Sequence, residues 1–218
     1  MNANESVAPQ RGRPTRLSRE QIVATALDIV AREGGDALSM RRVADALGCA
    51  PMSLYRHVRD KDELLVLLLD QVVGELPRPD LPADPRERLI TLLAWQHDQL
   101  AAHSWIVSVL AGGDVMAPSI LWLLEEIYSA WQDCGLPLDR AVAANRVVWR
   151  FTLGVLLQGT RRQRPRDRER YQVAVPARAD AGTYPTLAAL GAYWSAPDRD
   201  DHIAEDLTAL VDALIGHG

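Results

Sequence analysis

An all-α fold in two parts is predicted by three features of the sequence. Apolar residues recur at three- and four-residue intervals, and no segment has the sustained two-residue alternation typical of strands. Four prolines between residues 77 and 85 interrupt this pattern and indicate a domain boundary. The charge is also divided, because residues 11–61 hold ten Arg and Lys against six Asp and Glu, whereas residues 62–218 hold 14 against 22. These features predict a basic N-terminal module on an acidic helical body.

Length and composition argue against several classes of protein. The chain has 218 residues, of which 48% are hydrophobic, but it has no apolar run of about 18 residues, so no transmembrane helix and no membrane partner are expected. The N-terminus lacks an apolar signal segment, which predicts a cytoplasmic protein. Two cysteines make neither a disulfide framework nor a metal site. Without a Gly-rich phosphate loop or a nucleophile motif, we expect no enzyme, no cofactor and no metal.

The N-terminal part predicts a flexible basic arm followed by short helices. Residues 1–17 interleave arginines with glycine and proline, and this arm either contacts DNA or is a solvated tail. Ser18 and Gln21 form a capping box that starts the first helix, which ends at Gly34. A second helix begins after Ser39, a capping residue, and ends at Gly48.

The third helix of this part has an unusual distribution of side chains. Pro51 can occupy its first turn, and only Leu54 and Val58 are suited to a core position. A helix that buries so little must present its other side to a partner. Together with the preceding helix, it predicts a helix-turn-helix whose second helix enters the DNA major groove. The segment Lys61–Val73 then forms a strongly apolar helix that is expected to connect the two parts of the chain.

The segments 41–48 (RRVADALG) and 53–61 (SLYRHVRDK) resemble the tetracycline repressor (TetR) family of bacterial transcription regulators. The specific match covers residues 18–69. The resemblance implies a three-helix DNA-binding domain with its connecting helix at 18–76, and a larger ligand-binding and dimerisation domain at 77–218. Short side chains would meet base edges and longer polar ones would meet phosphates. The predicted DNA-binding residues are Arg41, Ala50, Pro51, Met52, Ser53, Tyr55, His57 and Lys61.

The second part predicts further helices, near 86–102, 105–110, 118–133, 139–160, 184–194 and 202–215, with a mobile loop at 161–183 that contains an Arg-rich run. The helices at 139–160 and 202–215 carry apolar stripes. The resemblance implies that these two helices form a four-helix bundle with a second copy of the chain. The alternative is that the stripes face the core of their own domain.

All six tryptophans lie in the second part. Each is suited either to a core or to the wall of a ligand pocket. The resemblance implies a ligand chamber among these helices, and its candidate residues are Trp95, His103, Trp105, Trp122, Trp131, Asn145 and Trp149.

The predicted function is that of a homodimeric repressor that binds a palindromic operator in double-stranded DNA. A small, largely apolar or aromatic effector would release it. The alternative is a ligand-independent regulator or activator whose helical body docks another protein.

Overall fold

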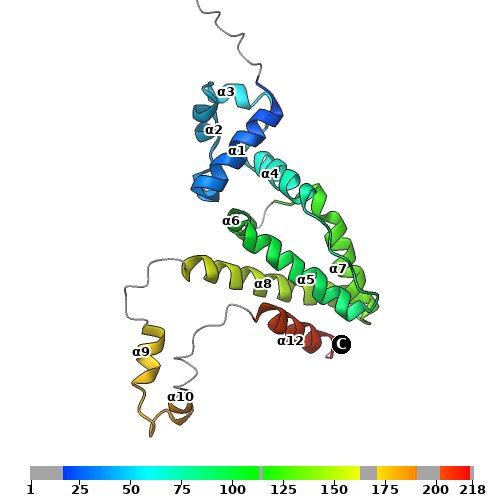
Figure 1. Ribbon diagram of the computed structural model, residues 1–218, viewed down its shortest axis with the longest axis vertical. Helices are drawn as coiled ribbons and strands as arrows, with labels where there is room; N and C mark the ends of the chain where they lie inside the picture. The colour runs from blue at the N-terminus through cyan, green and yellow to red at the C-terminus, as the bar shows by residue number, and fades with distance from the viewer. Residues whose placement is uncertain (1–16, 113–114, 163–170, 191–201, 217–218) are drawn as a thin grey trace, which may run out of the picture. The chain divides into compact units, whose positions relative to one another are not determined.

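The computed structural model describes residues 17–112, 115–162, 171–190 and 202–216, and every regular element among them is a helix (Figure 1). The all-α fold predicted from the sequence is therefore confirmed. Residues 1–16 of the predicted basic arm and positions 163–170 of the Arg-rich run lie outside the described residues.

The chain folds into two compact units, and each is built from two separate pieces of sequence. The first unit comprises residues 1–77 and 103–121, and the second comprises residues 78–102 and 122–218. The proline-rich boundary expected near residue 77 corresponds to the first crossing between the units. The sequence did not predict that the chain leaves the second unit at residue 102 and returns to it at residue 122. This middle segment joins the first unit because its apolar side chains, including Ile106 and Val107, are buried there.

The first unit contains the helices α1 (Arg19–Glu33), η1 (Gly35–Ala37), α2 (Met40–Leu47), α3 (Pro51–Leu54), α4 (Lys61–Glu75), α6 (Ser104–Ala111) and η2 (Pro118–Ile120). The predicted capping box of α1 is present, with Gln21 N–H donating to Ser18 Oγ at 3.2 Å and Ser18 N–H donating to Gln21 Oε1 at 3.1 Å. The α2 helix is capped by Ser39, whose hydroxyl accepts from Arg42 N–H at 3.1 Å. Local capping signals therefore locate these helix starts.

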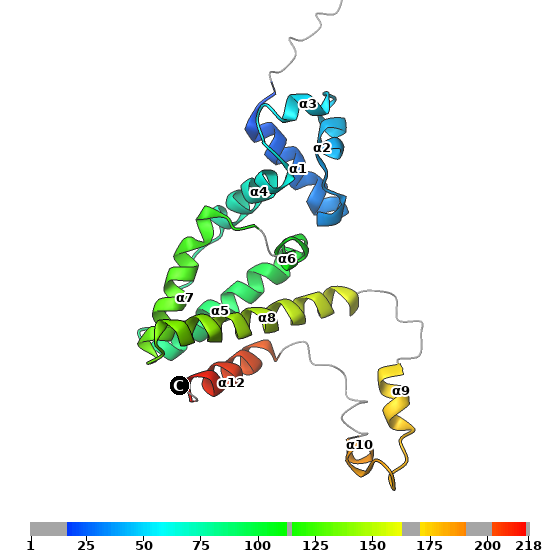
Figure 2. The same cartoon turned by 180° about the vertical axis from the view of Figure 1, so that it is seen from behind.

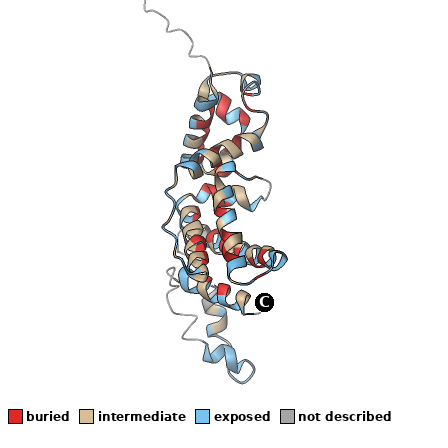
Figure 3. Ribbon diagram, turned by 90° about the vertical axis from the view of Figure 1, so that its right-hand side faces the viewer, coloured by how far each residue is buried: buried red, intermediate tan, exposed pale blue. Residues whose placement is uncertain are grey.

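The helix α4 packs against both the N-terminal and the later part of the first unit, through α1 and η2. Its start is capped by Asp60, which accepts from Glu63 N–H at 2.8 Å. Four leucines of α4 are buried in the core of the first unit. These are Leu64, Leu65, Leu68 and Leu69. Buried and exposed positions both occur along the helices in Figure 3, as expected where one side of a helix covers a core. The four buried leucines lie on one side of α4, so the apolar side chains of this helix cover the core of the first unit.

The second unit contains α5 (Pro85–Ala102), most of α7 (Leu121–Asp133), and α8 (Leu138–Arg162), α9 (Tyr171–Ala177), α10 (Pro185–Ala189) and α12 (Ile203–Ile215). The helices α5, α8 and α12 pack against one another, as both ribbon views show (Figures 1 and 2). Leu89, Leu92 and Leu93 of α5 are buried, as are Leu207 and Val211 of α12. These apolar contacts form the core of the unit.

The segment 161–183 contains a helix that the sequence did not predict. The helix α9 lies within residues 161–183, where the sequence predicted only a loop. Its short apolar run, broken by Pro176, is a weak helix signal.

Among the described helices none is long and apolar enough to cross a membrane. The described residues also include no cluster of three or more His, Cys, Asp or Glu side chains suited to a metal ion.

An ion pair joins α5 and α12, the first and last described helices of the second unit, and makes the stability of the protein depend on pH. Arg86 of α5 donates to the Asp212 carboxylate of α12 through Nε at 2.5 Å and Nη2 at 2.8 Å. This hydrogen bonding lowers the pKa of Asp212 below its ordinary value. A carboxyl with a lowered folded-state pKa stabilises the fold above its unfolded-state pKa of about 3.9, and the contribution is lost as the pH falls through the folded-state value.

We therefore expect Asp212→Asn to lower the unfolding free energy by a constant amount between about pH 5 and pH 7, with the difference shrinking below about pH 4. Urea unfolding followed by circular dichroism at several pH values measures this difference. Asp206→Asn removes another exposed carboxylate of the same helix and is the matched control. A deficit of Asp212→Asn that persists unchanged at low pH would contradict the assignment.

Candidate functional site

The turn between α2 and α3 depends on the backbone of Gly48. This residue has φ 64° and ψ 32°, in the left-handed region that side chains disfavour. A Cβ at this position would meet no atom of the described residues within 4 Å. The adjacent Cys49 N–H donates to Ala44 O at 3.0 Å and so closes the end of α2. Conformation, rather than lack of space, therefore requires glycine at the turn.

Two large side chains are buried in the segment 50–58, which contains α3. Leu54 is 0% exposed and Val58, just beyond the helix, is 1% exposed. On the other side, Met52 is 73% exposed and Tyr55 is 47% exposed. Hydrogen bonds from Ser53 N–H to Ala50 O and from His57 N–H to Leu54 O, both at 2.8 Å, hold the segment in helical geometry. A short helix is thus fixed at its base and leaves its outer side chains accessible.

All eight predicted DNA-binding residues retain some accessibility in the structure. Six are exposed and two, Ser53 and His57, are partly buried. The exposed ones are Arg41, Ala50, Pro51, Met52, Tyr55 and Lys61. They come from the start of α2, from α3 and its flanking residues, and from the first residue of α4. Their accessibility is what contact with base edges and phosphates requires.

Ion pairing separates the basic residues of this region into two groups. Arg42 is held by Glu33 at 2.6 Å, and this hydrogen bond lowers the pKa of the Glu33 carboxyl. Arg59 is similarly held by Asp60 at 2.9 Å. In contrast, Lys61 and Arg56 have no carboxylate partner within 4.0 Å among the described residues. Lys61 and Arg56 are therefore available to phosphates, and Arg41 is also accessible, because its guanidinium lies 4.0 Å from the Asp45 carboxylate and its side chain is 87% exposed.

Arg56 was not among the residues selected from the sequence. It is exposed and lies between the predicted contacts Tyr55 and His57. The sequence shows its charge but not its lack of a carboxylate partner, which depends on how the neighbouring acidic residues are placed. We add Arg56 to the candidate phosphate contacts for this reason.

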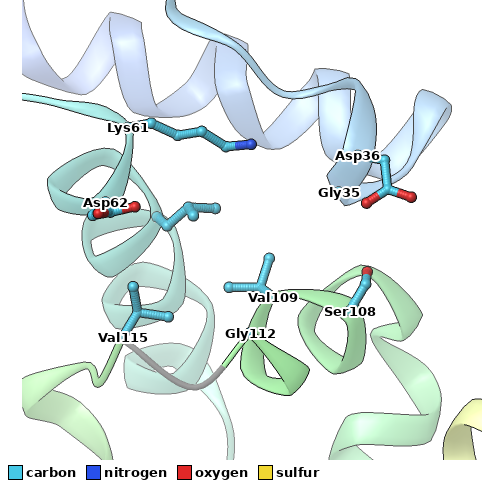
Figure 4. A pocket seen from close by; sticks show the side chains of 9 residues that line it. Gly35, Asp36, Lys61, Asp62, Ser108, Val109, Gly112 and Val115 are labelled. Atoms are coloured by element: carbon cyan, nitrogen blue, oxygen red, sulfur yellow. The ribbon is translucent and has the colours of Figure 1, made fainter.

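A cavity of about 260 Å³ lies within the first unit. Figure 4 shows Lys61 and Asp36 on opposite sides of it, with Val109 and Ser108 from α6 below them. The complete lining is Gly35, Asp36, Lys61, Asp62, Leu65, Ser108, Val109, Gly112 and Val115. None of the seven predicted ligand-binding residues lines this cavity. It belongs to the junction of η1, α4 and α6.

The same junction contains a close approach between η1 and α6. Gly35 is buried, and a Cβ placed on it would lie 3.2 Å from the Trp105 carbonyl oxygen and 3.3 Å from Ser108 Oγ. Unlike Gly48, Gly35 does not have a positive φ. Space is therefore limited at this position, and a side chain larger than that of alanine would push α6 away from η1.

We expect Gly35→Val to destabilise the protein by about 1–3 kcal/mol, the usual range for overpacking, and Gly35→Ala to have a much smaller effect. The alanine methyl requires its neighbours to shift by only a few tenths of an ångström, whereas the two valine methyls require more. Urea unfolding of the full chain measures both variants. If Gly35→Val were as stable as wild type, the close packing of α6 on η1 would be refuted.

The predicted ligand-binding residues are divided between the two units. His103 and Trp105 belong to the first unit, and Trp105 is buried there. Trp95, Trp122, Trp131, Asn145 and Trp149 belong to the second unit. The structure therefore does not assemble all seven residues within one unit.

Two of the tryptophans of the second unit form an aromatic cluster with a cation. The rings of Trp95 and Trp122 meet edge to face, with centroids 5.5 Å apart. The Arg78 guanidinium lies 4.6 Å from the centroid of the Trp122 ring. Both tryptophans are partly accessible. This arrangement offers ring faces and a cation, which suits contact with a planar aromatic compound.

Trp131 and Asn145 have different surroundings. Trp131 is 0% exposed, and its indole N–H is buried without a hydrogen-bond partner in the described part of the chain. Asn145 Nδ2 donates to the Tyr128 hydroxyl at 3.4 Å. Trp131 is thus a core residue in this structure, whereas Asn145 remains a partly accessible polar group.

A short exposed helix, presented by a capped helix and a left-handed glycine turn, defines a helix-turn-helix protein. Residues 22–68 match the family model described as bacterial regulatory proteins of the tetR family. Residues 78–214 match the tetracyclin repressor-like C-terminal domain. The chain therefore belongs to the TetR family of bacterial transcriptional regulators, as its resemblance predicted.

Relatives and solved structures agree with this assignment over most of the chain. The HTH-type transcriptional repressor DrrR1 of Streptomyces coeruleorubidus is 31% identical over 94% of this chain and 80% of its own length. An HTH-type transcriptional regulator of Saccharopolyspora erythraea is 32% identical over 92% of this chain and 86% of its own. The crystal structure of ActR of Streptomyces coelicolor in complex with actinorhodin is similar with a TM-score of 0.78 and 27% identity, covering 93% of this chain and 97% of ActR.

Proposed function

We propose that this chain is a homodimeric repressor that binds a palindromic operator and is released from it by a small, largely apolar or aromatic compound. The observation that carries the proposal is the outer side of α3, where Met52 and Tyr55 are exposed above a base fixed by Leu54. Lys61 and Arg56 flank it without carboxylate partners among the described residues. Such a helix supplies base contacts at its start and phosphate contacts at its end.

The proposed dimer is supported by the two sides of α8. Ala141, Ala144, Val148 and Leu156 are buried and account for packing within the unit. A second stripe, offset around the helix, is exposed and consists of Ala143, Val147 and Leu157. The alternative, that the apolar stripes of the two helices face the core of their own domain, accounts for the buried residues of α8 and for Leu207 and Val211 of α12, but not for this exposed stripe. A second copy of the chain, related by two-fold symmetry, would cover the exposed stripe. The dimer would then carry two copies of α3, one for each half-site of the operator.

The proposed effector is supported by the aromatic cluster of Trp95 and Trp122, which carries Arg78 over one ring. ActR, which is similar over nearly its whole length, has been solved with actinorhodin bound. We infer that this chain binds a compound with a planar aromatic part in its second unit. Ligand and DNA would then weaken each other's binding by the same factor.

The test is fluorescence anisotropy of the DNA upstream of the protein's own gene, titrated first with protein and then with actinorhodin and a panel of planar aromatic compounds. Binding that one compound reverses is the expected result. Binding that no compound reverses would refute effector control but leave DNA binding. No binding even at low salt, where phosphate contacts are strongest, would contradict operator recognition at this fragment.

A second candidate function keeps DNA binding but replaces the small ligand by a protein partner docked on the helical body. It is favoured by the exposed apolar residues of α9 and α10 and their flanks, namely Val175, Tyr184, Leu187 and Leu190. The anisotropy titration separates the two candidates, because this one predicts no response to any compound in the panel.

A further inference from the structure

A hydrogen bond links the connecting helix α4 to the segment that leads into α7. Ser119 N–H of η2 donates to Asp70 Oδ1 of α4 at 2.8 Å, across 49 positions of sequence. One turn further along α4, a Cβ on Gly74 would lie 3.9 Å from the Cβ of Ser119. The contact is therefore part of a close packing of η2 on α4 and not an isolated surface interaction.

The position of Ser119 makes this hydrogen bond mechanically important. Pro118 begins η2, and η2 continues without a break into α7, which starts at Leu121. The backbone N–H groups at the start of a helix lack partners within the helix, so they need an acceptor from elsewhere. Asp70 supplies both an acceptor and a negative charge at this helix start. It thereby holds the beginning of α7 on α4.

The Asp70–Ser119 hydrogen bond joins two helices that carry different predicted contacts, α4 with a DNA contact and α7 with an effector contact. On one side, α4 is anchored in the DNA-binding unit by four buried leucines and begins at Lys61, a predicted phosphate contact. On the other, the second residue of α7 is Trp122, a member of the aromatic cluster. The η2–α7 segment therefore runs from a contact with α4 directly to a predicted effector contact.

We propose that Asp70 is a positioning residue that couples effector binding to DNA binding by holding the start of α7 on α4. The inference rests on the proposed function and specifies how its two sites communicate. Displacement of Trp122 by an effector would move the start of α7, and the Asp70–Ser119 hydrogen bond would pass this movement to α4. Linkage requires the reverse effect as well, so DNA binding must alter the start of α7.

The reverse effect can be tested without knowing the effector. Hydrogen exchange of the full chain is measured by mass spectrometry with and without the DNA fragment upstream of its own gene. In wild type, DNA is expected to slow exchange in α2 and α3 and, by about fivefold or more, in the segment 119–124. In Asp70→Ala, DNA should still slow exchange in α2 and α3, but the response at 119–124 should fall below about twofold.

Two variants separate coupling from a merely structural role. Ser119→Ala is the matched control. It keeps the backbone N–H that donates to Asp70, and it removes only a buried hydroxyl that has no hydrogen-bond partner among the residues that the structure describes. It should transmit the DNA response as wild type does. Asp70→Asn keeps an acceptor oxygen of the same reach and should restore most of the response. If Asp70→Ala does not fold, Asp70→Leu removes the acceptor while filling its space.

The outcomes also distinguish this inference from the proposed function. If DNA slowed hydrogen exchange of the wild-type protein in α2 and α3 but not at 119–124, the coupling would be refuted and DNA binding would stand. An undiminished response in Asp70→Ala, or an equal loss in Ser119→Ala, would likewise overturn the role of the hydrogen bond. No slowing in α2 and α3 would refute operator binding to this fragment, and the proposed coupling would fall with it.

Discussion

Replacing Tyr55 with alanine is expected to weaken operator binding about a hundredfold while leaving the fold intact. A base or phosphate contact contributes about 1–3 kcal/mol, and about 1.4 kcal/mol corresponds to a factor of ten. A dimer loses two such contacts at once, one in each half-site. Because Tyr55 is 47% exposed and lies at the end of α3, its removal takes little from the core.

The measurement is anisotropy of labelled operator, with circular dichroism and light scattering of the free protein as checks on fold and mass. Tyr55→Phe separates the two parts of the side chain, since it removes the hydroxyl and keeps the ring. Leu54→Ala is the opposite case, because it empties a buried position and should lower stability by about 2–5 kcal/mol. Loss of folding in Tyr55→Ala would instead assign Tyr55 to the core.

The reading helices could be predicted from the sequence because their signals are local. Ser18 and Ser39 directly precede their helices and accept from a backbone N–H three residues further on, and Gly48 has the left-handed conformation that ends α2. The pattern of Leu54 and Val58 against exposed neighbours also needs no distant information. Short-range chemistry of this kind is read directly from neighbouring residues.

The division into units could not be predicted in the same way. Whether residues 103–121 join the first or the second unit depends on contacts such as Asp70–Ser119 and Gly35–Trp105, which join residues 49 and 70 positions apart. The prolines after residue 76 marked one crossing, but the crossings near residues 102 and 121 carry no comparable interruption. Tertiary packing decided the assignment.

The sequence likewise could not distinguish tryptophans of the core from tryptophans of a candidate ligand pocket. Trp131 is completely buried, whereas Trp95 and Trp122 are partly accessible and meet each other. All three lie on amphipathic helices, so periodicity treats them alike. The sequence predicted an aromatic second domain, and only the fold shows which rings remain accessible.

The exposed stripe of α8 leads to the second large effect. Val147 is 45% exposed, and we expect Val147→Glu to convert the proposed dimer into a monomer. Two-fold symmetry would bring two such carboxylates into one apolar interface, where neither has a partner. A monomer reads one half-site, so operator affinity should fall by about a hundredfold or more, the usual loss when two linked contacts become one.

Sedimentation equilibrium measures the mass, and anisotropy measures the operator affinity of the same sample. Val175→Glu is the matched control, because Val175 lies in α9 of the same unit and is 65% exposed. It should leave both mass and affinity unchanged. Since the buried stripe of α8 is untouched by Val147→Glu, helical content should also be retained. A Val147→Glu protein that remains dimeric and binds operator normally would show that the two copies meet elsewhere, and the exposed stripe would then need another partner.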